Sequence, residues 1–106
     1  MREEKAAMAK RFLSIQEIMD ACGVDKAFIL RLEQEKVIES RSVRRKRLYA
    51  LQQVERIRVA RVLIQDMQVN LEGVDVVLHM REQMIAMQRQ FEQVLNLLVE
   101  EVKKDR

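Results

Sequence analysis

The sequence predicts a mainly α-helical protein in which a small head with a two-stranded hairpin is followed by one long helix. The chain of 106 residues contains two glycines and no proline, with 35% charged and 4% aromatic residues. This composition favours helices over a sandwich or barrel. Residues typical of helix caps and stops divide the first part of the chain into short helices, and a heptad pattern runs through the last part.

The same observations predict three segments. We expect residues 1–11, which are charged and lack an apolar face, to form a flexible tail. Residues 12–69 would form the head, and residues 70–106 the long helix. The opening lacks the apolar run of a secretion signal, no stretch of about 18 apolar residues exists, and the single cysteine excludes an internal disulfide. We therefore expect a cytoplasmic protein.

The first helix has a recognisable start and stop. Ser14 and Glu17 have the spacing of a capping box, in which each side chain binds the other residue's backbone amide. Leu13 and Ile18 are placed as a hydrophobic staple around that cap. Gly23 is suited to end the helix because glycine readily adopts positive φ.

A second helix is predicted from Asp25, which is a plausible N-cap. Phe28, Ile29 and Leu32 give this helix an apolar face at helical spacing. Because only the turn "CGV" separates it from the first helix, the pair forms a helix-turn-helix candidate.

A hairpin and a third helix are predicted next. Val37 and Ile38 precede a polar centre and Leu48 and Tyr49 follow it, which favours two short strands and a loop. The third helix would run from about residue 51 to 67. Its turns are marked by Val54, Ile57, Val59 or Ala60, Arg61 and Ile64.

The long helix, expected from about residue 71 to 103 after an Asn70 cap, contains the clearest periodicity of the chain. Apolar residues recur at spacings of three and four over three heptads, with charges and glutamines elsewhere. A head this small cannot cover such a stripe, so we expect a homodimer; folding back onto the head is the alternative. The predicted dimer interface is formed by Val77, Met80, Met84, Met87, Phe91, Val94 and Leu98.

The densest charge lies in the predicted hairpin. Five of the seven residues at 41–47 are Lys or Arg, and residues 41–61 contain eight such residues against one Glu. Such a run repels itself unless anions are near, and phosphates are the commonest partners. A solvated basic loop and an acidic protein surface are the alternatives.

The order of these elements resembles the MerR family of bacterial transcription regulators over residues 12–95. "SIQEIMDACGV" corresponds to the family's capped first helix and turn, and "GVDKAFILRLEQEKVI" to its turn, second helix and entry to the wing. "KRLY" matches the end of the wing, with its arginine and tyrosine at Arg47 and Tyr49. "QVERIRVARVLIQDMQVNLEGVDVVLHM" resembles the third and fourth helices, and its "VNLEGV" is most similar to HspR-type heat-shock repressors.

Departures from the family pattern point to a second relative. The base- and phosphate-contacting positions of the family's second helix correspond here to Ala27, Leu30, Arg31 and Leu32, and Lys36 replaces the glycine that enters the wing. Such a helix would read sequence poorly. The chain is also similar to CbpM-type modulators, in which a degenerate MerR-like head binds the J-domain of a DnaJ-type co-chaperone. Their wing lacks the dense Arg/Lys run.

The resemblance implies a mainly α, winged helix-turn-helix head with a two-stranded wing, followed by a dimerisation helix that runs antiparallel to its partner. The second helix would enter the major groove while the wing lies on the duplex backbone. The predicted DNA-binding residues are Lys26, Arg31, Arg41, Arg44, Arg45, Lys46, Arg47 and Tyr49. Of Arg56, Arg58 and Arg61, at most one or two would face the duplex.

Other chemistry is not indicated. No set of catalytic residues, phosphate-binding loop or metal cluster is recognisable, so we expect no enzyme activity, cofactor or metal. His79 lies outside the seam, and Cys22 is expected to be buried as a small hydrophobe.

The sequence therefore predicts a DNA-binding transcriptional regulator, and a repressor in particular. It would act as a homodimer on two half-sites, without a ligand domain, and with a DnaK- or DnaJ-type chaperone as the partner that the HspR-like resemblance implies. The alternative is a CbpM-like modulator that binds a J-domain and does not bind DNA.

Overall fold

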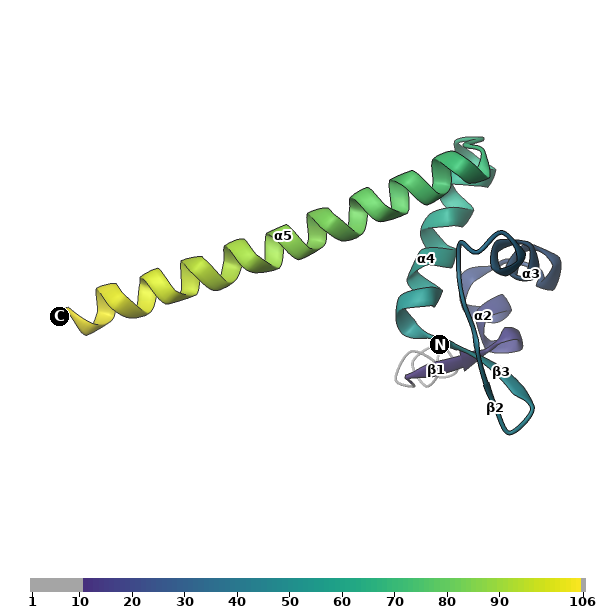
Figure 1. Ribbon diagram of the computed structural model, residues 1–106, viewed down its shortest axis with the longest axis horizontal. Coiled ribbons are helices and arrows are strands. Elements are labelled where there is room, and N and C mark those ends of the chain that lie inside the picture. Colours follow the sequence, from purple (N-terminus) through teal and green to yellow (C-terminus); the bar gives the residue numbers. More distant parts are fainter. Residues whose placement is uncertain (1–10, 106) are drawn as a thin grey trace. The chain divides into compact units, whose positions relative to one another are not determined.

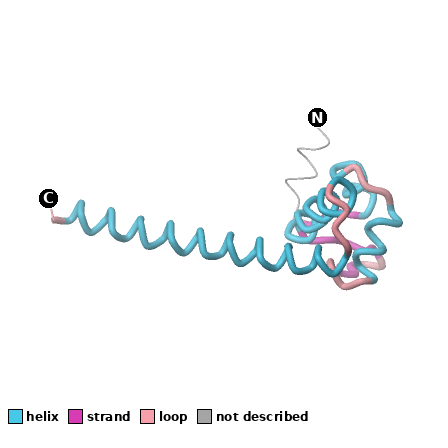
Figure 2. The backbone as a smooth tube through the Cα atoms, turned by 90° about the horizontal axis from the view of Figure 1, so that it is seen from above, coloured by secondary structure: helices cyan, strands magenta, loops and turns pink. Residues whose placement is uncertain are grey.

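The computed structural model describes residues 11–105, so the predicted N-terminal tail lies, except for Arg11, outside the described residues. The chain divides into two units, one ending at Asp75 and the other beginning at Val76. The first unit contains the head and only the first turn of the long helix; Figures 1 and 2 show these elements along the chain. The mainly α fold with a small sheet, predicted from the sequence, is confirmed.

Helix α2 spans Ile15–Cys22 and has the predicted caps. The Glu17 amide donates to Ser14 Oγ at 3.3 Å, and the Ser14 amide donates to Glu17 Oε1 at 3.1 Å, so the capping box is complete. Gly23 ends the helix at φ 67°, and its amide donates to the Met19 carbonyl at 3.0 Å. Local chemistry alone therefore sets both ends of this helix.

Helix α3 spans Lys26–Gln34 and begins at the predicted cap, where Asp25 Oδ1 accepts from the Phe28 amide at 2.8 Å. The chain leaves it through Lys36, whose φ of 61° lies in the left-handed region. This is the position where the sequence departs from the family's glycine. Lys36 therefore adopts the conformation that a glycine would take more readily.

The sheet has three antiparallel strands in the order β1-β3-β2, with β1 at Phe12–Ser14, β2 at Arg41–Val43 and β3 at Lys46–Ala50. Strand β3 pairs with both neighbours, so it is the centre of the sheet. The prediction of two strands missed β1, because its three residues carry no pattern of their own and are ordered by pairing with β3. The β2–β3 hairpin extends beyond the helices in Figure 1.

The prediction of a strand at Val37 and Ile38 is wrong, because the strand of the hairpin begins at Arg41. Both side chains are buried, as in a strand, but their amides donate to the Leu32 carbonyl at 2.9 and 3.4 Å. These bonds close the end of α3. The buried apolar pair therefore reflects the exit from a helix rather than entry into a sheet.

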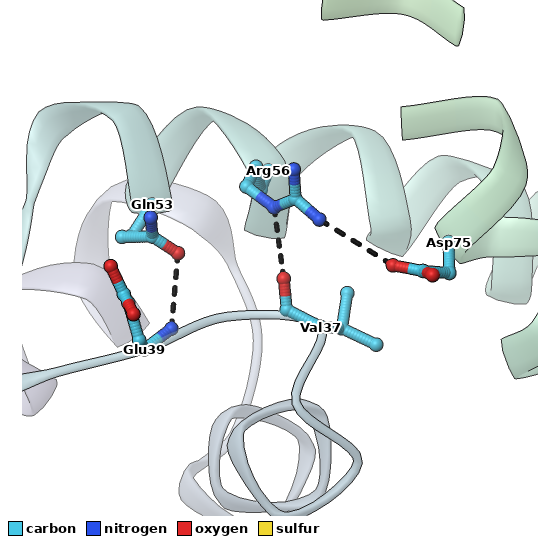
Figure 3. Close-up of polar contacts among 5 residues, drawn as sticks. All are labelled: Val37, Glu39, Gln53, Arg56 and Asp75. Atoms are coloured by element: carbon cyan, nitrogen blue, oxygen red, sulfur yellow. Dashed lines mark hydrogen bonds and ion pairs between the residues drawn. The ribbon is translucent and has the colours of Figure 1, made fainter. Parts of the chain in front are cut away.

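Two side chains of α4, which spans Leu51–Arg61, hold this segment in place (Figure 3). Arg56 Nε donates to the Val37 carbonyl at 2.8 Å, and the Arg56 guanidinium lies 3.7 Å from Asp75 Oδ1. Gln53 Oε1 accepts from the Glu39 amide at 3.0 Å. The path into the hairpin is therefore tied to α4 at two points.

The third helix has two parts, since α4 continues as the π-helical segment η1 at Val62–Asp66. Of the two candidates for an apolar turn position of this helix, Ala60 is buried and Val59 is not. The next buried position is Leu63, where the sequence predicted Ile64. The buried core of the first unit consists of Leu13, Ile18, Cys22, Val24, Ile29, Leu32, Val37, Ile38, Tyr49, Val54, Ile57, Ala60, Leu63 and Val74.

Helix α5 spans Leu71–Lys104, in agreement with the predicted long helix. Its start is capped as expected, with Asn70 Oδ1 accepting from the Gly73 amide at 2.7 Å. The seven predicted seam residues are between 36% and 68% exposed. Among residues 11–105, no helix is both long and apolar enough to cross a membrane.

We predict that Gly23→Ala lowers the free energy of unfolding by about 1 kcal/mol, because a β-carbon is disfavoured at positive φ. No atom lies within 4 Å of the added carbon, so the loss would be conformational rather than steric. Gly23→Asn is the matched control and should lose less, because Asn tolerates the left-handed region. Urea denaturation at one protein concentration measures both, and equal losses would contradict the conformational explanation.

Candidate nucleic-acid interface

The hairpin at residues 41–50, here called the wing, ends in an unusual turn. Val43 pairs with Lys46, which leaves Arg44 and Arg45 as a two-residue loop. Their φ angles are 52° and 65°. Positive φ at both central residues is the requirement of a type I′ turn, where Asn-Gly is preferred. Two arginines here cost about 1–2 kcal/mol each relative to the right-handed region.

The alternation of side chains along β3 divides the charges of the wing between two faces. Tyr49 and its cross-strand partner Leu13 are both buried, so this face points into the core. Arg47 lies two residues before Tyr49 and therefore shares that face. Lys46 and Leu48 flank Arg47 in the strand, so both belong to the opposite face. Arg41 pairs with Leu48 across the hairpin and therefore lies on that opposite face too.

The cations of the outer face and the tip are exposed to solvent. The Arg41 guanidinium lies over the Phe12 ring, 5.7 Å from its centroid, a cation–π distance that orients it without neutralising it. Within residues 11–105, no hydrogen bond or ion pair is formed by the side chains of Arg44, Arg45 and Lys46. These three side chains are therefore available to an anionic partner.

Arg47 differs from the other wing cations, because it has an acidic partner. Its Nη1 lies 3.0 Å from Oε2 of Glu33, in the last turn of α3. The Arg47 side chain is 49% exposed and that of Glu33 is 20% exposed. The pair links the wing to α3 and reduces the net charge that Arg47 contributes to the surface.

Tyr49 is completely buried, at 0% exposure. Burial raises the pKa of its phenol, the nearby Glu33 carboxylate raises the pKa further, and the Arg47 guanidinium opposes both effects. The hydroxyl lies close enough to the Glu33 carboxylate and the Arg47 guanidinium to interact with both, but neither contact has strict hydrogen-bond geometry. The expected contact between this hydroxyl and a phosphate therefore requires the wing to move, and the position itself contributes packing.

On α3, the predicted contact residues Lys26 and Arg31 are both exposed, as is Ala27. Of the other positions aligned with family contacts, Leu30 is half-buried, while Leu32 is in the core at 1% exposure. The exposed surface of α3 thus offers two cations for a groove. Few side chains of this helix would therefore be available to recognise the base sequence of a duplex.

The arginines of α4 are largely engaged within the head. Arg56 is bound as described above, and Arg58 lies beside the thiol of Cys22. Burial raises the pKa of the Cys22 thiol, and the positive charge of Arg58 opposes that rise. Among residues 11–105, no three His, Cys, Asp or Glu side chains are arranged to hold a metal ion.

Sequence reasoning missed one residue of this region, Glu33. Its partner Arg47 is far away in the sequence, and no local pattern connects a helix end with the second strand of a hairpin. The only signal was an acidic residue in the last turn of a helix, where the dipole disfavours negative charge by about 0.3–1 kcal/mol. Such a charge suggests a cationic neighbour.

A helix-turn-helix followed by a basic hairpin that extends beyond it defines a winged helix-turn-helix, a class of DNA-binding domain. The model of the MerR HTH family regulatory proteins matches residues 13–96. The chain therefore belongs to this family of DNA-binding transcription regulators. No match was found among curated proteins or among solved structures.

We predict that Tyr49→Phe raises the free energy of unfolding at neutral pH by about 1 kcal/mol, because the buried hydroxyl that it removes lies beside Glu33 and Arg47 without good hydrogen-bond geometry to either. Because the folded state raises the phenol pKa, the wild type should lose stability as the pH rises above about 10, while the unfolded chain ionises first. Tyr49→Phe should lack this loss.

Urea denaturation from neutral to alkaline pH measures both effects. Tyr49→Ala is the contrasting variant and should cost about 3–5 kcal/mol through the cavity it leaves. A less stable Tyr49→Phe protein would mean that the hydroxyl has a partner in solution.

Proposed function

We propose that this protein is a repressor that binds duplex DNA as a homodimer and grips the phosphates with its wing. The observation that carries the proposal is the tip formed by Arg44 and Arg45. Both hold positive φ, at a place where other residues would form the turn at lower cost. Strain that local folding does not explain is a reason to look for a function, and two guanidiniums at a projecting tip fit phosphate oxygens.

The outer face adds to this grip. Arg41 and Lys46 are exposed on the side of the wing opposite the core. Together with the tip they give four cations without an acidic partner among the described residues. Each phosphate contact steepens the dependence of log K on log salt by about 0.9. The contribution of the wing to binding should therefore be strongly salt-dependent and nearly independent of sequence.

Base discrimination is assigned to α3 and is expected to be modest. Lys26 and Arg31 are its exposed cations, and each would contact a base edge or a phosphate in the major groove. Phosphate contacts fix position, whereas base contacts specify sequence. With two candidate side chains, one head alone would distinguish sites weakly.

Dimerisation would compensate for this weakness by joining two heads on two half-sites. The seam residues of α5 support it, because a stripe that is at least one-third exposed at every position leaves apolar surface in water. A heptad pattern of this length is suited to pairing with a second copy. Two half-sites would then lie about one helical turn, or a multiple of it, apart.

The competing function is a modulator that binds a J-domain and not DNA. A DnaK- or DnaJ-type partner is compatible with either function. Fluorescence anisotropy with a nonspecific duplex at two salt concentrations separates them. Affinity that falls steeply with salt is expected for the repressor, and no binding at low salt would exclude it.

We predict that the double variant Arg44→Asn/Arg45→Gly is more stable than the wild type by about 1 kcal/mol, because Asn-Gly is preferred in this turn. It should bind every duplex more weakly. The salt slope should be shallower by up to about 1.8, because two phosphate contacts are lost. Urea denaturation measures the stability of the variant, and fluorescence anisotropy on the same preparation measures its affinity for duplex DNA.

The control for this variant is Lys103→Ala/Lys104→Ala, which removes the same charge from exposed positions at the end of α5. This control should retain the wild-type salt slope. A tip variant that binds duplexes as tightly as the wild type would remove the wing from the interface. A change in sequence preference alone would reassign the tip to base contacts.

We predict that Phe91→Glu converts the dimer to a monomer. Phe91 is 64% exposed in the single chain and has seam residues on both sides of it. In a dimer its replacement would bury an uncompensated charge, which costs about 3 kcal/mol or more, about 100-fold in Kd. Analytical ultracentrifugation over a concentration series measures this change.

The matched control is Gln90→Glu, which adds the same charge one residue away, outside the seam. It should remain dimeric. A wild-type protein that sediments as a monomer at all concentrations, or equal effects of the two substitutions, would refute pairing through this seam.

A further inference from the structure

We propose that Glu33 limits the grip of the wing by holding Arg47 as an internal substitute for a phosphate. This proposal rests on the proposed DNA binding and concerns its strength. A carboxylate and a phosphate both present oxygen atoms to a guanidinium, so they compete for the same donors. In the free protein the carboxylate of Glu33 occupies Arg47, at 3.0 Å.

The geometry of β3 makes this competition specific to Arg47. The other wing cations lie at the tip or on the outer face, whereas Arg47 lies on the inner face, one alternation step from buried Tyr49. Of the wing cations, Arg47 is the one that the structure pairs with a carboxylate of α3. At 49% exposure, Arg47 remains accessible to a duplex that approaches the wing.

Stability of the head does not explain the presence of Glu33. Its charge lies at the end of a helix, where the dipole is unfavourable. Its Oε1 is buried without strict hydrogen-bond geometry to any described residue, although the carboxylate lies close to the Tyr49 hydroxyl, and this incomplete pairing is a further cost. Oε2 pairs with Arg47 at 3.0 Å. The carboxylate is therefore costly to the fold, and its effect on the wing offers a reason for it.

The energies involved are suited to adjusting an affinity. An ion pair that is partly exposed contributes a factor of only about 1.4 to 5 in an equilibrium constant. Exchange of Glu33 for a phosphate would cost that amount and would cancel most of the gain from one phosphate contact. The wing would then bind DNA with the affinity expected for four phosphate-binding cations, although its sequence contains five. Because phosphate contacts act on all sequences alike, this limit chiefly lowers nonspecific binding.

The test is a double-mutant cycle on nonspecific duplex, with Glu33→Gln, Arg47→Ala and the combination of both. Gln retains the size of Glu and an acceptor for Arg47, so only the charge is removed. Glu33→Gln should bind about threefold more tightly, with a salt slope steeper by about 0.9. In the Arg47→Ala background, the same substitution should have little effect.

The matched control is Glu35→Gln, which removes an equal charge from an exposed position just beyond α3. It measures the general effect of one negative charge fewer near the wing. If Glu33→Gln changes the affinity no more than Glu35→Gln, the inference is wrong. If Glu33→Gln weakens binding, Glu33 positions Arg47 for DNA, and the proposal is overturned.

A second readout does not involve DNA. Tyr49 is the only tyrosine, so alkaline titration of tyrosinate absorbance reports on this cluster alone. Glu33→Gln should lower the phenol pKa and Arg47→Ala should raise it, because the two charges act in opposite directions. If neither variant shifts it, the Glu33–Arg47 pair does not form in solution and the proposal fails.

The two proposals fail differently. If the wild type and all variants fail to bind duplex at low salt, DNA binding itself is refuted, and this inference falls with it. If the wild type binds but Glu33→Gln gains nothing, only the role of Glu33 is refuted. Binding by Glu33→Gln where the wild type binds weakly would support both.

Discussion

The central strand β3 is the constraint on which the rest of the head depends. It pairs with β1 on one side and with β2 on the other, so its register fixes which side chains enter the core and which enter the wing surface. Burial of Tyr49 at 0% exposure anchors that register. A slip by one residue would exchange the two faces of the strand, so that Lys46 would turn toward the core and Tyr49 toward solvent. The arrangement of basic side chains is thus a consequence of core packing.

The wing also depends on the segment that leads into it. Residues 37–40 have no ladder of backbone hydrogen bonds, so their path is set by the end of α3 and by side chains of α4. Arg56 binds the Val37 carbonyl and lies beside Asp75, and it therefore ties the wing entrance, α4 and the start of α5 into one unit (Figure 3). Arg56, one of three arginines of which at most one or two were expected to face a duplex, is used here to hold the surface that carries the predicted DNA contacts.

The sequence predicted what is local and missed what depends on pairing at a distance. The capping box of Ser14 and Glu17, the Asp25 cap and the Asn70 cap lie within one helical turn, so spacing alone revealed them. Strand β1 exists only because it pairs with β3. The apolar pair Val37 and Ile38 predicts a strand because the sequence reveals its burial, whereas the sequence does not reveal that the pair lacks a strand to pair with.

The candidate site follows the same division. The charge run at 41–47 was evident, and so was its position before Tyr49. The positive φ of Arg44 and Arg45 was not, because the preferred residues of that turn are absent from the sequence. Nor did any local pattern connect Arg47 with Glu33. The number of cations was therefore predictable, but the number free to bind phosphate was not.

This difference matters for a reader of DNA whose second helix offers few base contacts. Every additional phosphate contact strengthens binding to all sequences equally, so a stronger grip lengthens residence on wrong sites as much as on the right one. If α3 contributes only the exposed Lys26 and Arg31, the discrimination of one head would be small. An unrestrained wing would then hold the protein on the excess of nonspecific DNA. If an internal carboxylate moderates one of five wing cations, single-head binding would stay weak, and the two heads of the proposed dimer would both be needed for stable occupancy. Specificity would in that case come from the spacing of half-sites, set by α5, more than from the contacts of either head.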